Sequence, residues 1–176
     1  MYTLQLSRLN VMDELKFSIS YERYNGLEEL NESDKHLCLQ ARQALVTSYS
    51  PYSNFRVGTA VSLKGGQVVL GSNQENLAYP SGLCAERVAL FTIGATYPDA
   101  VIERIAVTAF SADFDIEQPV TSCGACLQVM SEFERKQASE IVLLFYCLEG
   151  PVLKLTGIKS LLPFAFAEEQ LLKQKK

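Results

Sequence analysis

The spacing of apolar positions changes several times along the chain, and each change predicts an element. Residues 14–21 alternate between polar and apolar side chains, the pattern of a half-buried strand. Residues 31–34 are polar and typical of a helix start, and an apolar stripe at helical spacing follows them through residue 45. This helix should end by Ser50, because Pro51 disfavours helical geometry in the residue before it.

The rest of the chain alternates between strands and helices. Residues 64–67 contain two glycines and should turn the chain between two short strands. Residues 141–146 are almost wholly apolar, which is typical of a buried parallel strand. The expected elements are strands at residues 55–63, 68–70, 102–110, 141–146 and 152–156, and helices that open at Cys84 and Cys123.

The order of these elements predicts the fold class. Strands separated by helices imply right-handed crossovers and a parallel portion, while the hairpin adds an antiparallel pair. We therefore expect an α/β fold, a three-layer α/β/α sandwich around a mixed five-stranded sheet, plus an extra N-terminal strand. Because no internal repeat or linker is evident, residues 1–176 should form a single domain. Residues 1–25 would be an N-terminal extension that provides an edge strand or an oligomer contact.

Composition narrows the class of partner. With 16 basic and 20 acidic residues the net charge is −4, which argues against a broad nucleic-acid contact. No apolar run approaches the roughly 20 residues that span a bilayer, so no membrane partner is expected. An odd count of five cysteines, without a secretory signal pattern, indicates reduced thiols and a cytoplasmic location.

Three cysteines lie at predicted helix starts, where the partial positive charge of the helix end favours thiolates. They are Cys84, Cys123 and Cys126. Three protein ligands leave the fourth position of a tetrahedral zinc ion open for water. Glu86 follows Cys84 by two residues, close enough to handle protons on that water. Taken alone, the Cys123-x-x-Cys126 pair could also be a redox pair, half of a structural zinc site or a coincidence.

Two features bear on whether such a site is catalytic or structural. A closed four-ligand site would need Cys38, Cys147 or His36, none of which lies in a second ligand motif. A carboxylate in the first turn of a buried apolar helix, as Glu86 is, costs free energy without a partner or a function. Its plainer interpretation is an ion pair with Arg87 or a favourable contact with the helix dipole. Arg87 could instead donate to the thiolates and offset their excess negative charge.

These residues resemble a known signature. Cys84-Ala85-Glu86 followed by Cys123-x-x-Cys126 is similar to the signature of the zinc-dependent cytidine deaminases, specifically the small type with three cysteine ligands. Other stretches from about residue 30 to 166 look like the same family. They are residues 50–58, which resemble its approach to the first strand, residues 73–76, which resemble its ribose-binding loop, and residues 161–166, which resemble its C-terminal segment.

The resemblance implies a role for each matching residue. It implies one Zn²⁺ per chain, held by Cys84, Cys123 and Cys126, with Glu86 as the proton shuttle. The roles implied for the substrate are ribose binding by Asn73 and Glu75, a flank for the pyrimidine ring from Phe55, and contact with the base edge from the backbone of Ala85. In this family the site is completed across the subunits of a homotetramer. The residues that would reach a neighbouring site are Tyr79, Phe164 and Phe166.

The activity that the resemblance implies is hydrolytic deamination. Cytidine and 2'-deoxycytidine would become uridine and 2'-deoxyuridine with release of ammonia, a step of pyrimidine salvage. One alternative is a deaminase of another aminopyrimidine nucleoside, of the blasticidin type, although Asn73 and Glu75 favour a ribose ligand. A second alternative is a zinc-stabilised binding protein without turnover, against which the intact Glu86 argues.

The chain departs from the family pattern at two positions. The family usually has proline directly before the first cysteine of the pair and a basic residue directly after the second. This chain has Ser122 and Leu127 there. The resemblance also implies contacts to the base edge from the loop before Cys123. We expect the serine to loosen this loop, and the leucine to remove a charge near the surface. Neither residue is expected to contact a zinc-binding cysteine or Glu86.

Overall fold

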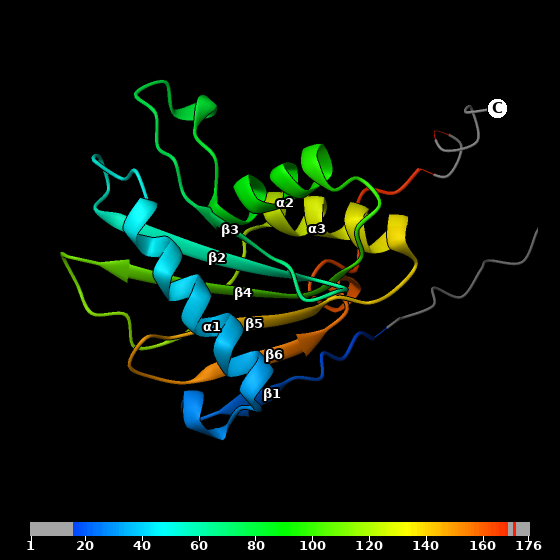
Figure 1. Cartoon of the computed structure of the whole chain (residues 1–176), viewed down its shortest axis with the longest axis horizontal. Coiled ribbons are helices and arrows are strands. Elements are labelled where there is room, and N and C mark those ends of the chain that lie inside the picture. The colour runs from blue at the N-terminus through cyan, green and yellow to red at the C-terminus, as the bar shows by residue number, and fades with distance from the viewer. Residues whose placement is uncertain (1–15, 169–170, 172–176) are drawn as a thin grey trace, which may run out of the picture.

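The computed structural model of the chain describes residues 16–168 and residue 171. Within them, a six-stranded sheet lies between one helix on one face and two helices on the other (Figure 1). The strands are β1 (Glu22–Tyr24), β2 (Phe55–Leu63), β3 (Val68–Ser72), β4 (Ile102–Ser111), β5 (Val142–Tyr146) and β6 (Val152–Thr156). The helices are α1 (Glu32–Ala44), α2 (Ala85–Thr96) and α3 (Gly124–Gln137), with 3-10 turns η1 (Leu27–Glu29), η2 (Leu45–Thr47), η3 (Tyr79–Ser81) and η4 (Ile158–Ser160).

The sheet has the order β1-β6-β5-β4-β2-β3. Only β4 and β5 pair in parallel, and the other neighbours are antiparallel. The buried run at residues 141–146 is therefore the parallel strand that its composition predicts. The three-layer sandwich, the mixed sheet and the extra N-terminal strand are all confirmed.

The position of the N-terminal strand differs from the prediction. β1 covers only Glu22–Tyr24 and forms one edge of the sheet, where it pairs with β6 and Arg23 lies opposite Leu153. Residues 16–21 have no regular secondary structure and are all exposed, and residues 14 and 15 lie outside the described part of the chain. Because neither face of this stretch is buried, its alternating pattern has no core to pack against.

Two apolar cores lie on opposite faces of the sheet. Neighbouring positions of β4 point to different cores, since Ala106 faces α1 while Ile105 and Val107 face α2 and α3. Leu127 is 7 % exposed and belongs to the core between the sheet and helices α2 and α3. The position where the family usually has a basic residue is therefore apolar and buried here. Among residues 16–168, no helix is long and apolar enough to cross a membrane.

A glycine allows α2 to lie directly on β3. A Cβ atom at Gly71 would come within 2.3 Å of the Ala85 carbonyl oxygen and 2.8 Å of the Ala89 backbone nitrogen. Both contacts are with backbone, so a side chain here would push the helix away from the strand. Since α2 begins at Ala85, this close approach fixes the height of Cys84 and Glu86 above the sheet.

Candidate functional site

Three cysteine sulfurs meet at the N-termini of two helices. Cys84 is the N-cap residue of α2, Cys123 is the N-cap residue of α3, and Cys126 lies in the first turn of α3. Their sulfur atoms all lie within 4.8 Å of one another, and those of Cys123 and Cys126 are 3.9 Å apart. Tetrahedral zinc with Zn–S bonds of about 2.3 Å separates its sulfurs by about 3.8 Å, so the cluster fits this ion.

The candidates for a fourth ligand lie elsewhere. Cys38 is fully buried in the core beneath α1, on the opposite face of the sheet. The Cys147 thiol donates to the carbonyl oxygen of Ile116 at 2.9 Å, and His36 is exposed on α1. In the described part of the chain the sulfur cluster therefore has three thiols and no fourth side-chain ligand, which is the donor set of an open site.

The thiols differ in acidity. A hydrogen bond from the Cys126 thiol, supplemented by the Arg87 guanidinium, lowers the pKa of Cys84 to about 6. The same hydrogen bond, together with burial, raises the pKa of Cys126. Arg87 donates to the Cys84 sulfur over 3.7 Å, and no ion pair joins it to Glu86 among the described residues. The guanidinium thus lies where it can offset thiolate charge.

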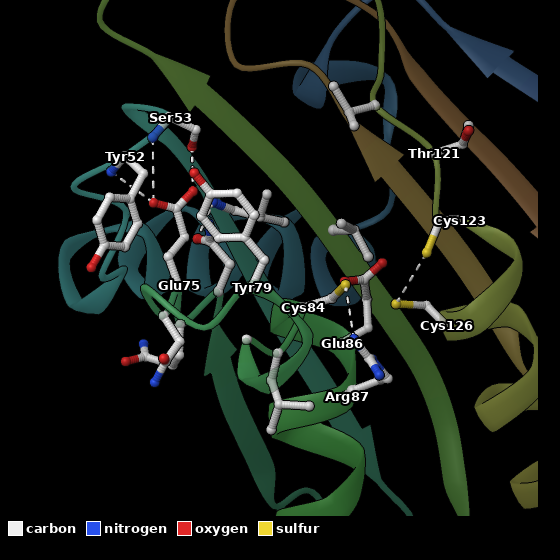
Figure 2. A pocket seen from close by; sticks show the side chains of 18 residues that line it. Tyr52, Ser53, Glu75, Tyr79, Cys84, Glu86, Arg87, Thr121, Cys123 and Cys126 are labelled. Carbon is white, nitrogen blue, oxygen red and sulfur yellow. Dashed lines mark hydrogen bonds between the residues drawn. The ribbon is translucent and has the colours of Figure 1, made fainter.

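Glu86 lies beside the sulfurs in the first turn of α2, and its side chain is almost fully buried (Figure 2). The Ser122 hydroxyl donates to its Oε1 atom at 2.6 Å. The expectation that Ser122 does not touch Glu86 is therefore wrong. Because serine has no ring and carries a hydroxyl, it supplies a hydrogen bond that proline cannot make.

A cavity of about 620 Å³ opens over this cluster, a size suited to a small molecule. At one end it is lined by the three thiols, Glu86 and Arg87. Figure 2 shows a second group across the cavity, where Glu75 lies among Tyr52, Ser53 and Tyr79. Other residues that line the cavity include Val57, Val107, Val120 and Thr121.

Asn73 ties the start of β2 to the end of β3. Its Oδ1 atom accepts from the backbone N–H of Val57 at 2.8 Å and from the Ser48 hydroxyl at 2.6 Å. Its Nδ2 atom donates to the Phe55 carbonyl at 2.9 Å. An amide nitrogen has two N–H donors and an amide oxygen two acceptor sites, so a single N–H of Asn73 is left for a ligand in the cavity.

Glu75 is held by the loop that precedes β2. Its Oε2 atom accepts from the backbone N–H groups of Tyr52 and Ser53 at 2.9 and 3.3 Å, and its Oε1 atom accepts from the Ser53 hydroxyl at 2.5 Å. The Ser53 hydroxyl and these N–H groups lower the pKa of Glu75, which therefore stays ionised at neutral pH. A carboxylate has about four acceptor sites, so one remains for a ligand hydroxyl.

The other predicted substrate contacts lie at different distances from the cavity. Tyr79 lines it, is largely exposed, and meets the Tyr52 ring edge-to-face at 6.3 Å. Phe55 stacks on Phe114 at 6.1 Å and is not among the lining residues. Ala85 is fully buried in the first turn of α2 and is not among the residues that line the cavity either.

The C-terminal aromatics lie outside this cavity. Phe164 is 84 % exposed and meets the ring of Phe17 edge-to-face at 5.6 Å. Phe166 is 71 % exposed, and its backbone N–H and carbonyl are both bonded by the Gln128 side chain on α3. Both rings are therefore available on the surface of the chain.

Sequence analysis missed Tyr52 as a residue of the cavity and Ser122 as the partner of Glu86. Tyr52 lies inside the matched stretch at residues 50–58, so its place in that motif was a usable signal. Ser122 and Glu86 are 36 residues apart and belong to different elements, and no local pattern reports such a contact.

Comparison with known proteins gives a consistent result. Residues 31–142 match the family model described as the cytidine and deoxycytidylate deaminase zinc-binding region. The chain is 38 % identical over 135 residues to a cytidine deaminase of Halalkalibacterium halodurans, a match that covers 77 % of this chain and 95 % of that protein. A cytidine deaminase of Sporosarcina psychrophila is 36 % identical over 137 residues, with 77 % and 92 % covered.

A solved structure agrees in fold. The crystal structure of a cytidine deaminase from Burkholderia pseudomallei has a TM-score of 0.65 and 35 % sequence identity, and the match covers 78 % of this chain and all of the other. The family match includes Cys84, Cys123 and Cys126, whose sulfurs form the cluster that fits a single Zn²⁺ ion. The chain therefore belongs to the family of cytidine and deoxycytidylate deaminases that share this zinc-binding region.

Proposed function

We propose that this protein catalyses the hydrolytic deamination of cytidine and 2'-deoxycytidine to uridine and 2'-deoxyuridine, with release of ammonia. The observation that carries the proposal is one cavity with a three-thiol cluster and Glu86 at one end and Glu75 across from them, with Asn73 also among its lining residues. The relatives that are named cytidine deaminases support the same substrate.

The chemistry requires water to replace the amino group at C4 of the base. A C4–O bond forms, the C4–N bond breaks, and the two protons of water end on ring nitrogen N3 and on ammonia. Cys84, Cys123 and Cys126 would hold the zinc ion, which would supply a Lewis acid to lower the pKa of the water. Glu86 takes a proton at its carboxylate and delivers it to the base, because it is the one carboxylate that lines the cavity beside the sulfurs.

The far end of the cavity suits the sugar. The remaining N–H of Asn73 can donate to a ribose hydroxyl oxygen, and the remaining acceptor site of Glu75 can accept from a hydroxyl hydrogen. A sugar hydroxyl is both donor and acceptor, so this pair matches it. Tyr52 and Tyr79 border the same end and would shield the sugar from solvent.

The assembly and location are also part of the proposal. We propose a cytoplasmic homotetramer of single-domain subunits, with residues 1–25 as an extension of each. Tyr79, Phe164 and Phe166 would contact a neighbouring subunit's site, for which their high exposure leaves them available. Sedimentation or light scattering of the full chain tests the tetramer, which a monomer at micromolar concentration would contradict.

The activity is tested by incubating protein that holds one zinc per chain with cytidine and following the ultraviolet absorbance of the cytosine ring. We expect absorbance to fall as uridine forms. Protein stripped by a chelator should be inactive and should recover when zinc is returned. Absence of turnover with both cytidine and 2'-deoxycytidine, in protein shown to hold zinc, would overturn the proposal.

A further inference from the structure

A buried hydrogen bond joins the two helix N-termini that carry the thiols. The Ser122 hydroxyl donates to Oε1 of Glu86 at 2.6 Å. Ser122 is 9 % exposed and Glu86 is 4 % exposed, so water competes little for either group. Ser122 directly precedes Cys123, the N-cap residue of α3, whereas Glu86 lies in the first turn of α2. The contact therefore connects the Glu86 carboxylate of α2 to the residue that directly precedes α3 and its N-cap.

Ser122 is the side-chain partner on which Glu86 depends. Within residues 16–168, the Ser122 hydroxyl makes the one side-chain hydrogen bond to this carboxylate, and no cation forms an ion pair with it. The terminal torsion of a glutamate is broad, so an unrestrained carboxylate samples many orientations. A hydrogen bond to a charged acceptor is among the stronger ones in proteins, and here it selects one orientation.

The hydrogen bond also gives the two oxygens of the Glu86 carboxylate different roles. Because Oε1 already accepts from Ser122, Oε2 is the oxygen that has no side-chain hydrogen bond within residues 16–168 and keeps both of its acceptor sites for reacting atoms. We propose that Ser122 is a positioning residue, which holds the Glu86 carboxylate so that Oε2 meets the substrate and its water in a fixed orientation. This inference rests on the proposed deamination, and it explains how the chain functions with serine where the resembling family usually has proline.

The main test is Ser122→Ala in zinc-loaded protein. We expect kcat for cytidine to fall about tenfold to a hundredfold, the effect of losing a hydrogen bond to a charged group. KM should change by less than about threefold, because the hydroxyl acts on Glu86 and touches neither the sugar nor the thiols. Zinc content should remain one per chain. A Ser122→Ala variant with the kcat of the native protein would overturn the inference.

Two further variants separate positioning from a general structural role. Ser122→Thr keeps the hydroxyl and should recover most of the lost kcat, and a threonine variant no faster than the alanine variant would contradict the inference. Ser131→Ala is the matched control, because it removes another hydroxyl of this helix region, one that bonds the Gln128 carbonyl. Its kcat should be unchanged, and a loss equal to that of Ser122→Ala would show that the effect is nonspecific and overturn the inference.

A measurement that needs no turnover keeps this inference distinct from the proposed function. Urea unfolding of the zinc-loaded native protein, Ser122→Ala, Glu86→Ala and the double variant forms a double-mutant cycle, in which alanine at residue 86 removes the acceptor that glutamine would keep. We expect non-additive effects, since removing either partner breaks the same bond. Additive effects would overturn the contact whatever the substrate is. If the native protein fails to deaminate cytidine while the cycle is non-additive, the proposed function fails and the contact stands.

Discussion

The two ends of the cavity are built in different ways. At the metal end, the N-termini of two helices present Cys84, Cys123 and Glu86, and the helices themselves are fixed by the apolar core. At the sugar end, Asn73 and Glu75 are held by hydrogen bonds to backbone and hydroxyl groups 16 to 25 residues away in the chain. The first end depends on where helices begin, whereas the second depends on how a loop docks onto a strand.

This difference predicts separate functional consequences. Changes at the metal end should alter zinc content or kcat, because this end touches the reacting atoms. Changes at the sugar end should alter mainly the binding of the nucleoside, because Glu75 lies across the cavity from the sulfurs and Asn73 bonds the backbone of Val57 and Phe55. The following substitutions test that separation.

Glu86→Gln should have the largest effect. An amide cannot accept the proton from water, so kcat should fall by about 10²- to 10⁴-fold or more while zinc content stays at one per chain. Turnover and metal analysis on the same sample check this. Glu28→Gln on the surface is the control for loss of one negative charge and should be neutral, since Glu28 is highly exposed. Substantial turnover by the Glu86→Gln variant would remove Glu86 as the proton shuttle.

Gly71→Ala should lower both the free energy of unfolding and the turnover, although residue 71 does not line the cavity. The new Cβ would meet the backbone of α2 at 2.3 Å, and overpacking of this kind lowers the free energy of unfolding by about 1–3 kcal/mol. Because α2 carries Cys84 and Glu86, turnover should fall as well. Urea unfolding and kcat are the measurements. Gly26→Ala is the matched control, since its Cβ would meet nothing within 4 Å, and equal destabilisation by both variants would contradict the close approach.

Glu75→Gln should affect the sugar end alone. Glutamine can keep its oxygen toward the N–H groups of Tyr52 and Ser53, but it then has an NH2 donor where Glu75 has its remaining acceptor site, so kcat/KM for cytidine should fall about 10- to 100-fold. Zinc content should not change, and the slow reaction of free cytosine, which has no ribose, should be unaffected. If cytosine deamination fell as much as cytidine deamination, the assignment of Glu75 to the sugar would be wrong.

Arg87→Ala should have the smallest effect of the four. The guanidinium reaches the Cys84 sulfur at 3.7 Å, a long contact, and outer groups of metal sites typically contribute about 10- to 100-fold in metal affinity or activity. We expect a loss near the lower value, seen as faster zinc release to a chelator. Arg23→Ala, at the exposed sheet edge, controls for removal of a positive charge. Unchanged zinc retention and unchanged turnover would exclude this role.

Local signals in the sequence predict much of the fold. The bounds of β2 and β6 are those that the apolar pattern predicts, and the Asn31 side chain caps α1 by accepting from the backbone of Asp34. The predictions for these elements are confirmed because the positions that are apolar in the sequence are also the positions that are buried in the fold. β1 lies outside the alternating stretch 14–21, because pairing with β6, which no local pattern displays, decides where this short strand forms.

In the site, too, local patterns predict some features, whereas contacts between distant segments are not predicted. Spacing and helix starts bring Cys84, Cys123 and Cys126 together, because each ligand lies at the beginning of a strongly patterned helix. No local pattern predicts that Ser122 bonds Glu86 or that Phe55 stacks on Phe114, since both contacts join segments distant in the chain. Departures from a family pattern are therefore the positions at which a structure adds most.

The central claim is that one cavity joins a deaminating metal end to a sugar-binding end. The most direct test compares cytidine with free cytosine on the same zinc-loaded protein. A site that hydrogen-bonds hydroxyl groups rejects a substrate that lacks them, so we expect kcat/KM for cytidine to exceed that for cytosine by at least about 10³-fold. Equal values for the two substrates, or a preference for cytosine, would contradict the claim.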